Sequence, residues 1–196
     1  RGTGPAVTPI RALVSEFGQQ TFTVRGRAFR FHAMAPVPTS KLDDKERRLG
    51  WPLPLDYREM LRVAGPAHVF GATMVPMERL RGRIEYDRLP DGTIVRDRVR
   101  CYLPFAERAT ETSARVLFAY AFGLDLARVA GDIAAVARGE VREPFHGAAS
   151  SVVMCKVEAD QPMRLSDDAQ WFARDFTDWC GTLVSLLRRL PTTAAA

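Results

Sequence analysis

Hydrophobic residues recur at helical spacing near the N-terminus of the chain, between Pro9 and Phe17. Proline suits the first turn of a helix, and the preceding Thr8 is a favourable capping residue. The shared apolar face contains Ile10, Leu13, Val14 and Phe17. The pattern therefore predicts a short first helix. In the alternating segment that follows, residues 21–33, Gly26 interrupts the alternation and predicts either a strand pair or a bulged strand.

Two further helices are predicted on either side of residue 50. The first covers residues 40–49, and we expect Asp43 and Asp44 in its first turn, where negative charge suits the helix dipole. The second begins at Pro54 and ends at Gly65, because glycine readily adopts the left-handed conformation of a helix terminator. The apolar face of this second helix contains Tyr57, Met60, Leu61 and Ala64.

The middle of the chain predicts strands and turns. An apolar run over residues 67–75 indicates one strand, and residues 76–80 indicate a turn or a short helix. Asp91-Gly92 is a strong signal for the turn of a polar hairpin. A two-residue turn at this dipeptide pairs Asp87 with Arg96, Glu85 with Arg98, and Arg83 with Arg100.

This hairpin register has a consequence for charge. It places the paired charged residues on one exposed face and turns Ile84, Tyr86, Val95 and Val99 toward the core. Opposite charges pair favourably across strands, whereas Arg83 and Arg100 would repel each other. The expected uncompensated positive group is therefore Arg81, Arg83 and Arg100.

The C-terminal half predicts two buried strands and two helices. Residues 115–122 and 151–157 are rich in β-favouring side chains, and the first of these segments indicates a central strand. A helix is expected over residues 126–138. The last helix is predicted to begin at a capping Ser166. Its apolar stripe contains Phe172, Phe176, Trp179, Leu183 and Leu187.

These elements predict an α+β fold: a single domain with a mixed, mostly antiparallel sheet and helices packed on it. A chain of 196 residues with 46% hydrophobic content suits one core. The longest apolar run, residues 116–124, is too short to cross a membrane, and the N-terminus lacks the features of a secretory signal. Three widely spaced cysteines indicate partly buried free thiols. We therefore expect a cytoplasmic protein.

The positive charge of the chain is regional. Residues 1–100 carry 18 basic and 11 acidic side chains, whereas residues 101–196 carry 10 and 12. Nucleic-acid binding through this arginine-rich half is one alternative function. The arginines are interleaved with acids such as Glu85, Asp87 and Asp97, and no reader motif accompanies them. This pattern favours a solvated face of mixed charge.

The search for reactive chemistry predicts none. His32, His68 and His146 are isolated in the sequence, without a metal-ligand motif. There is no GxSxG elbow and no glycine-rich phosphate loop. The paired carboxylates lie at predicted helix starts, where capping explains them. We expect no catalytic residue, no metal and no cofactor, and hence no enzyme.

One segment is more specific than any of these patterns. Residues 46–80, ERRLGWPLPLDYREMLRVAGPAHVFGATMVPMERL, resemble the SUKH superfamily, a group of bacterial immunity and cell-wall-regulator domains. The matching residues are Leu49, Gly50, Leu53, Pro54, Asp56, Tyr57, Arg58, Leu61 and Gly65. Two later segments agree with the family order, YLPFAE at 102–107 and DDAQWFARDFTDWC at 167–180. The family's usual Asn-Gly is Ala64-Gly65 here, and ERATETSAR replaces its Gly-Asp pair.

The resemblance implies a SUKH-like domain over residues 40–190, with an N-terminal extension over residues 1–39 and a flexible tail at 191–196. It implies protein recognition without catalysis, most often by an immunity protein that neutralises a cognate bacterial toxin through direct binding. A regulatory or scaffolding SUKH domain is the alternative within the family. Because this chain is basic, its toxin is expected not to be a basic nuclease, or the contact uses the acidic C-terminal half.

Four residues are candidates for partner binding. Three are the arginines of the hairpin, Arg81, Arg83 and Arg100. The fourth is Trp51, which lies between Gly50 and Pro52 at the entrance to the matched helix. Trp51 is either a core wedge or an exposed anchor, and its position favours the core.

Overall fold

The computed structural model describes residues 9–18, 21–24, 27–49, 52–93, 95, 100–110, 114–122, 149–157 and 169–189. These residues form four helices and nine strands. The helices are α1 (Pro9–Phe17), α2 (Thr39–Leu49), α3 (Leu55–Ala64) and α7 (Phe176–Arg188). The strands are β1 (Thr21–Val24), β2 (Arg27–Ala33), β3 (Ala67–Val69), β4 (Ala72–Met74), β5 (Arg83–Glu85), β6 (Arg100–Ala109), β7 (Arg115–Phe122), β8 (Ala149–Val157) and β9 (Gln170–Ala173).

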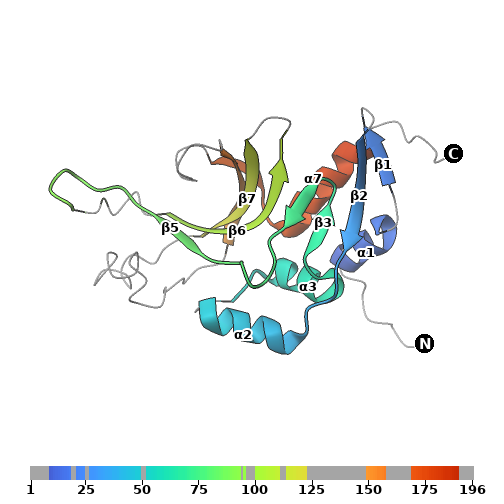
Figure 1. Cartoon of the computed structure of the whole chain (residues 1–196), viewed down its shortest axis with the longest axis horizontal. Coiled ribbons are helices and arrows are strands. Elements are labelled where there is room, and N and C mark those ends of the chain that lie inside the picture. The colour runs from blue at the N-terminus through green and yellow to red at the C-terminus, as the bar shows by residue number, and fades with distance from the viewer. Residues whose placement is uncertain are drawn as a thin grey trace.

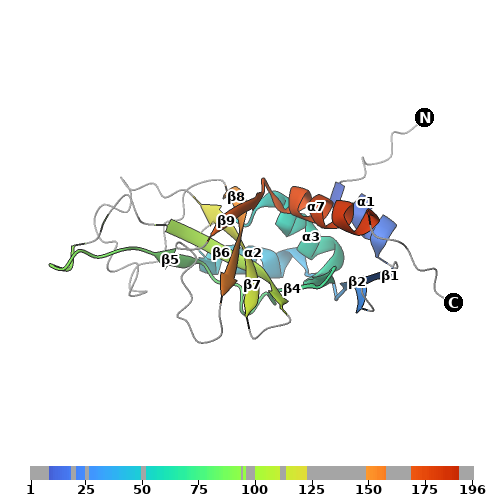
Figure 2. The same cartoon turned by 90° about the horizontal axis from the view of Figure 1, so that it is seen from above.

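The described strands form one sheet in the order β1-β2-β3-β4-β6-β7-β8-β9, with β5 paired to β6. Every pairing among them is antiparallel. Helices α1, α3 and α7 lie side by side against this sheet, as Figures 1 and 2 show. The predicted α+β single domain is confirmed. The segment 21–33 is the strand pair β1 and β2, one of its two predicted forms.

The main core lies between the sheet and the helices. Tyr57, Met60, Leu61 and Ala64 of α3 are all buried, which confirms the predicted apolar face. They belong to the same buried cluster as Trp179 of α7 and residues from β2, β3, β4, β6, β7, β8 and β9. A smaller cluster occupies the other face of β6, β7 and β8, and contains Tyr102, Leu117, Ala119, Val153, Cys155 and Val157. All three cysteines are buried and free.

The segment predicted as one strand over residues 67–75 is two strands joined by a tight turn. Phe70 and Gly71 both adopt positive φ, of 50° and 92°, and reverse the chain between β3 and β4. A Cβ atom at residue 71 would lie only 3.0 Å from the ring of Phe29. Glycine therefore satisfies both the backbone conformation and the close approach. The prediction of a single strand was wrong because a bulky residue at positive φ gives no turn signal.

The predicted hairpin turn is present, but its register differs from the prediction. The loop has three residues, because the Leu89 N–H donates to the Thr93 carbonyl and Gly92, at φ 87°, donates to the Leu89 carbonyl. A left-handed glycine after such a turn adds a residue to one strand. At the base of the hairpin, Glu85 lies opposite Arg100 and not Arg98.

The exposed face predicted for the hairpin is also wrong at Glu85, which is only 6% exposed. Its carboxylate accepts from Arg83, with 2.8 Å between Nε and Oε1. Arg83 lies opposite Tyr102, and not opposite Arg100 as predicted. The buried Glu85 side chain thus compensates part of the positive group that the sequence left without a partner.

Two helix starts differ from the predictions. The last helix begins at Phe176 and not near Ser166, since β9 precedes it. Asp175 caps this helix by accepting the N–H of Asp178 at 2.8 Å. Helix α2 begins at Thr39, so its first turn contains no acidic residue. The predicted helix over 126–138 lies outside the described residues. None of the described helices is both long and apolar enough to cross a membrane.

Candidate protein-binding surface

Arg58, a residue of the matched motif, joins α3 to α2. Its guanidinium donates to Asp43 of α2, with 2.6 Å between Nη2 and Oδ1, and it also pairs with Glu46. The hydrogen bond to Asp43 raises the pKa of Arg58. Glu46 in turn accepts the backbone N–H of Leu53 at 2.9 Å. One face of α2 is therefore fixed to the start of α3 by charged hydrogen bonds.

Asp56, the next acidic residue of the motif, joins α3 to α7. Its Oδ2 accepts the backbone N–H of Thr177, 3.0 Å away in the first turn of α7. Its Oδ1 accepts from the N–H of Tyr57 at 2.8 Å and lies 3.4 Å from the Tyr120 hydroxyl. Burial, with the nearby Asp56 charge, raises the pKa of Tyr120 and of the Cys180 thiol. Asp56 thus satisfies a helix terminus that is distant in sequence.

Tyr57 completes the structural role of the motif. Its ring contacts Phe105, Tyr120 and Phe176, with ring centres 5.5 to 5.9 Å apart. Burial raises the pKa of Tyr57, and its hydroxyl has no hydrogen-bond partner among the described residues. The motif Asp56-Tyr57-Arg58 therefore connects helices and fills the core.

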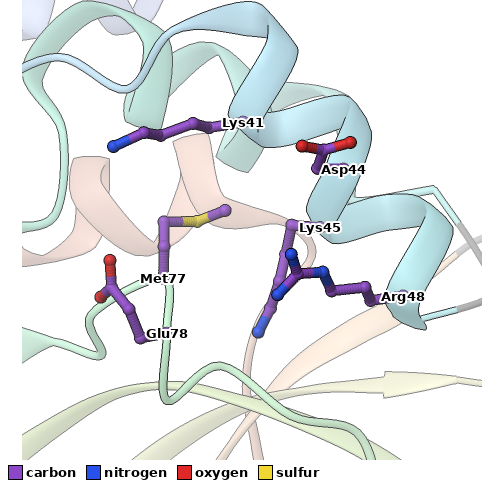
Figure 3. A pocket seen from close by; sticks show the side chains of 6 residues that line it. All are labelled: Lys41, Asp44, Lys45, Arg48, Met77 and Glu78. Carbon is purple, nitrogen blue, oxygen red and sulfur yellow. The ribbon is translucent and has the colours of Figure 1, made fainter.

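The other side of α2 lines an open pocket, which Figure 3 shows from close by. The pocket has a volume of about 350 Å³. Its opposite wall is the turn that follows β4. The lining residues are Lys41, Asp44, Lys45 and Arg48 of α2, with Met77 and Glu78 of the turn. Lys45 extends from α2 toward the turn, and the guanidinium of Arg48 lies beside it (Figure 3).

Positive charges are crowded at this pocket. Burial lowers the pKa of Lys45, and the neighbouring cations Arg81 and Arg48 lower it further, against a smaller opposing effect of Glu78. Asp44 is engaged by Arg47, with 2.7 Å between Nη1 and Oδ1. Within the described part of the chain, no ion pair is formed by Lys41, Lys45, Arg48 or Arg81. We call these four residues the basic cluster.

The basic cluster suits negatively charged groups. Crowded cations gain free energy when an anion approaches, and most of all where burial has removed part of their hydration. Glu78 opposes only part of the effect of burial and of the neighbouring cations on Lys45. Lysine and arginine both bind carboxylates and phosphates. Met77 adds an apolar wall on which an aliphatic stem would pack. The arrangement therefore offers a binding site for an anionic group.

The predicted partner-binding residues are distributed unevenly. Arg81 is exposed and close enough to Lys45 to lower its pKa, so it belongs to the basic cluster. Arg83 is paired with Glu85, and Arg100 lies opposite Glu85 on the neighbouring strand. Trp51 lies outside the described residues.

Three members of the basic cluster were missed by the sequence reasoning. Lys41, Lys45 and Arg48 follow one another at i, i+4 and i+7, which places them on one side of a helix. They include two of the three lysines in the chain, Lys156 being the third. That spacing was a usable signal. The turn that completes the pocket becomes visible only in three dimensions.

Where the structure is described, no group of three or more histidine, cysteine or acidic side chains is arranged to hold a metal ion. Comparison with known proteins finds no matching family model, no matching curated protein and no matching solved structure.

Proposed function

We propose that this chain is a protein-binding domain of the SUKH type, and specifically an immunity protein that neutralises a cognate bacterial toxin by direct binding. The observation that carries the proposal is the basic cluster, with four cations beside a pocket and no ion pair to any of them from the described residues. The resemblance of residues 46–80 to the SUKH superfamily supports it. The Asp56-Tyr57-Arg58 side chains within that segment join helices and fill the core. The proposed contact therefore uses the other side of α2.

The proposed contact inserts an acidic segment of the toxin into the pocket. Burial lowers the Lys45 pKa, and repulsion by Arg81 and Arg48 lowers it further. A carboxylate between Lys45 and Arg48 would offset that repulsion. The pocket is smaller than a complete interface, since stable complexes bury about 1,600 Å² in total. Residues around α2 and the turn after β4 would supply the remaining area. Charge complementarity at such a site raises the association rate and selects an acidic partner surface.

Co-expression with the toxin tests the function. We expect growth to be restored when this chain is produced together with the toxin encoded beside its gene, and a stable complex to be isolated. If the neighbouring gene encodes no toxin, or if growth is not restored, the immunity function is wrong. A stable complex with a protein that is not a toxin would instead support the scaffolding alternative.

A pair of matched charge reversals tests the surface. Lys41→Glu with Arg48→Glu should weaken the complex by at least tenfold, because two attractive contacts become repulsive. Arg30→Glu with Arg108→Glu removes the same charge from exposed positions outside the pocket and should leave affinity within about twofold. Equal affinities for the two variants would exclude the pocket as the contact. Salt-sensitive binding of DNA or RNA by the wild type, lost in the pocket variant, would favour the nucleic-acid alternative.

A further inference from the structure

We propose that His32 and His68 form a binding site for a divalent transition-metal ion on the sheet face opposite the helices. The site is independent of the proposed function. It uses two of the three histidines in the chain. Although they are 36 residues apart in sequence, the pairing of β2 with β3 places them directly opposite each other.

The direction of both side chains follows from the strands. Their neighbours Phe31 and Val69 are buried in the helix-covered core, so alternation turns His32 and His68 to the other face. Both histidines are exposed. Their ring centres are 6.3 Å apart, and the ring planes differ by 33°. The two imidazoles therefore stand side by side in solvent.

The separation suits one shared ion. Two nitrogens that bind the same zinc ion at about 2.0–2.1 Å lie no more than about 4.2 Å apart. Ring nitrogens on facing edges come closer together than the ring centres do. Small rotations of the side chains of His32 and His68 would bring one nitrogen of each within that limit. The exposed His32 ring is free to make most of this movement.

Thr73 orients one of the two ligands. Thr73 lies on β4, the strand next to β3, directly opposite His68. Its hydroxyl oxygen is 3.0 Å from Nδ1 of His68. When Nδ1–H donates to this oxygen, the lone pair of Nε2 faces away from Thr73 and is available to a metal. Hydrogen bonds of this kind commonly fix the tautomer and orientation of a metal-binding histidine.

The donor set defines the class of metal. Two neutral imidazoles favour Zn²⁺, Ni²⁺ and Cu²⁺ over Mg²⁺ or Ca²⁺, which prefer oxygen ligands. Glu107 lies opposite Thr73 on β6, two strands away from His68. Strands are about 4.8 Å apart, so Glu107 is too distant to be a third ligand. Water would fill the remaining coordination positions, and a carboxylate or imidazole from another molecule would be able to replace it.

Calorimetric titration of the full chain with Zn²⁺ tests the site, in a buffer that does not bind metals. We expect one saturable site in the wild type. His32→Gln and His68→Gln should each weaken binding by at least tenfold. Thr73→Val, which removes only the orienting hydroxyl, should weaken binding about tenfold. His146→Gln is the matched control and should bind as the wild type does.

A second readout separates this site from binding to cysteine thiols. In wild-type protein, Zn²⁺ should shift the imidazole NMR signals of His32 and His68 and leave those of His146 in place. Loss of saturable binding in either histidine variant, with an unchanged melting temperature, would support the site. Absence of saturable Zn²⁺ binding in the wild type would overturn it, as would retention of binding by the variant that lacks both His32 and His68.

Discussion

Helix α2 has two charged sides that behave in opposite ways. Toward α3, Asp43 and Glu46 are both bonded to Arg58, and Glu46 also accepts the Leu53 N–H. Toward the turn after β4, Lys45 and Arg48 are crowded together, and no ion pair to them exists in the described part of the chain. The same helix thus carries one charged face that stabilises the fold and one whose charges repel each other.

The difference distinguishes charges used for folding from charges available for binding. Removing Arg58 would leave the carboxylates of Asp43 and Glu46 without this partner, so Arg58 contributes to the stability of the fold. Removing Arg48 would relieve its repulsion of Lys45, so Arg48 is not required for the stability of the fold. A cation that the fold would tolerate losing is a better candidate for partner recognition than one that the fold requires. The following predictions compare side chains that the fold requires with side chains that it would tolerate losing, and they end on the charge state of Lys45. They run from the largest expected effect to the smallest.

The two tryptophans of the C-terminal region give the largest contrast. Trp179 is fully buried and contacts Phe105, Phe118 and Phe176. Trp179→Ala should therefore lower the free energy of unfolding by about 3–5 kcal/mol. Trp171 is 65% exposed on β9, and Trp171→Ala should change it by less than about 0.5 kcal/mol. Urea denaturation measures both, and equal losses would mean that α7 is packed differently.

The next largest effect is a difference in stability between substitutions at the two sides of α2. Arg58→Met should lower the free energy of unfolding by about 1–3 kcal/mol, because Glu46 is partly buried and would lose its charged partner. Arg48→Met should leave it within about 0.5 kcal/mol of the wild type. The two substitutions remove the same chemical group. If denaturation midpoints fall equally for both variants, the distinction between the two sides of α2 is wrong.

Asp56 should have a smaller effect than Arg58. Asp56→Ala removes the acceptor for the Thr177 N–H at the start of α7, and losing such a cap costs about 0.5–2 kcal/mol. Asp44→Ala is the matched control, because its pair with Arg47 is largely exposed and should contribute less than about 1 kcal/mol. Hydrogen exchange should increase in the first turn of α7 for the Asp56 variant alone. Unchanged exchange there would mean that Asp56 does not cap this helix.

Local periodicity predicted the elements whose apolar residues recur at helix or strand spacing within a single segment. Helix α1 covers Pro9–Phe17 and strand β7 covers Arg115–Phe122, both with the predicted bounds. The buried face of α3 was also predicted, because it follows from helical spacing alone. The α+β class followed from the order and type of such elements.

The failures arose where distant residues decide the local structure. Phe70 adopts positive φ because β3 and β4 must reverse there, and a phenylalanine gives no sign of it. Ser166 is a good capping residue, but the residue that caps α7 is Asp175. Residues 170–173, which were expected to be helical, form the strand β9. The buried position of Glu85 goes with a strand register that differs from the one predicted by a two-residue turn at Asp91-Gly92. The basic pocket needs the turn after β4 to lie against α2.

The smallest effect concerns the protonation of Lys45. Burial and the neighbouring cations lower its pKa from the ordinary lysine value of 10.5. Between the lowered value and 10.5, the folded protein binds fewer protons at Lys45 than the unfolded chain does. The contribution of Lys45 to stability therefore rises with pH across that window, because deprotonation removes the cost of burying the charge and relieves the repulsion. At neutral pH Lys45 is charged in both states, and its crowding opposes folding slightly.

Acylation of the lysines, followed by peptide mass spectrometry, measures this protonation directly, since only the neutral amine reacts. The pH midpoint of Lys45 labelling should lie below 10.5 in the wild type. Arg81→Gln should raise the midpoint by removing a repelling cation, whereas Glu78→Gln should lower it by removing the attracting carboxylate. Arg30→Gln, an exposed position outside the pocket, serves as the control and should leave it unchanged. Opposite shifts in the Arg81 and Glu78 variants are expected only if Arg81 lowers the Lys45 pKa and Glu78 raises it. Shifts of the same sign in both would show that the turn after β4 does not lie against α2, and the basic cluster would no longer be one site.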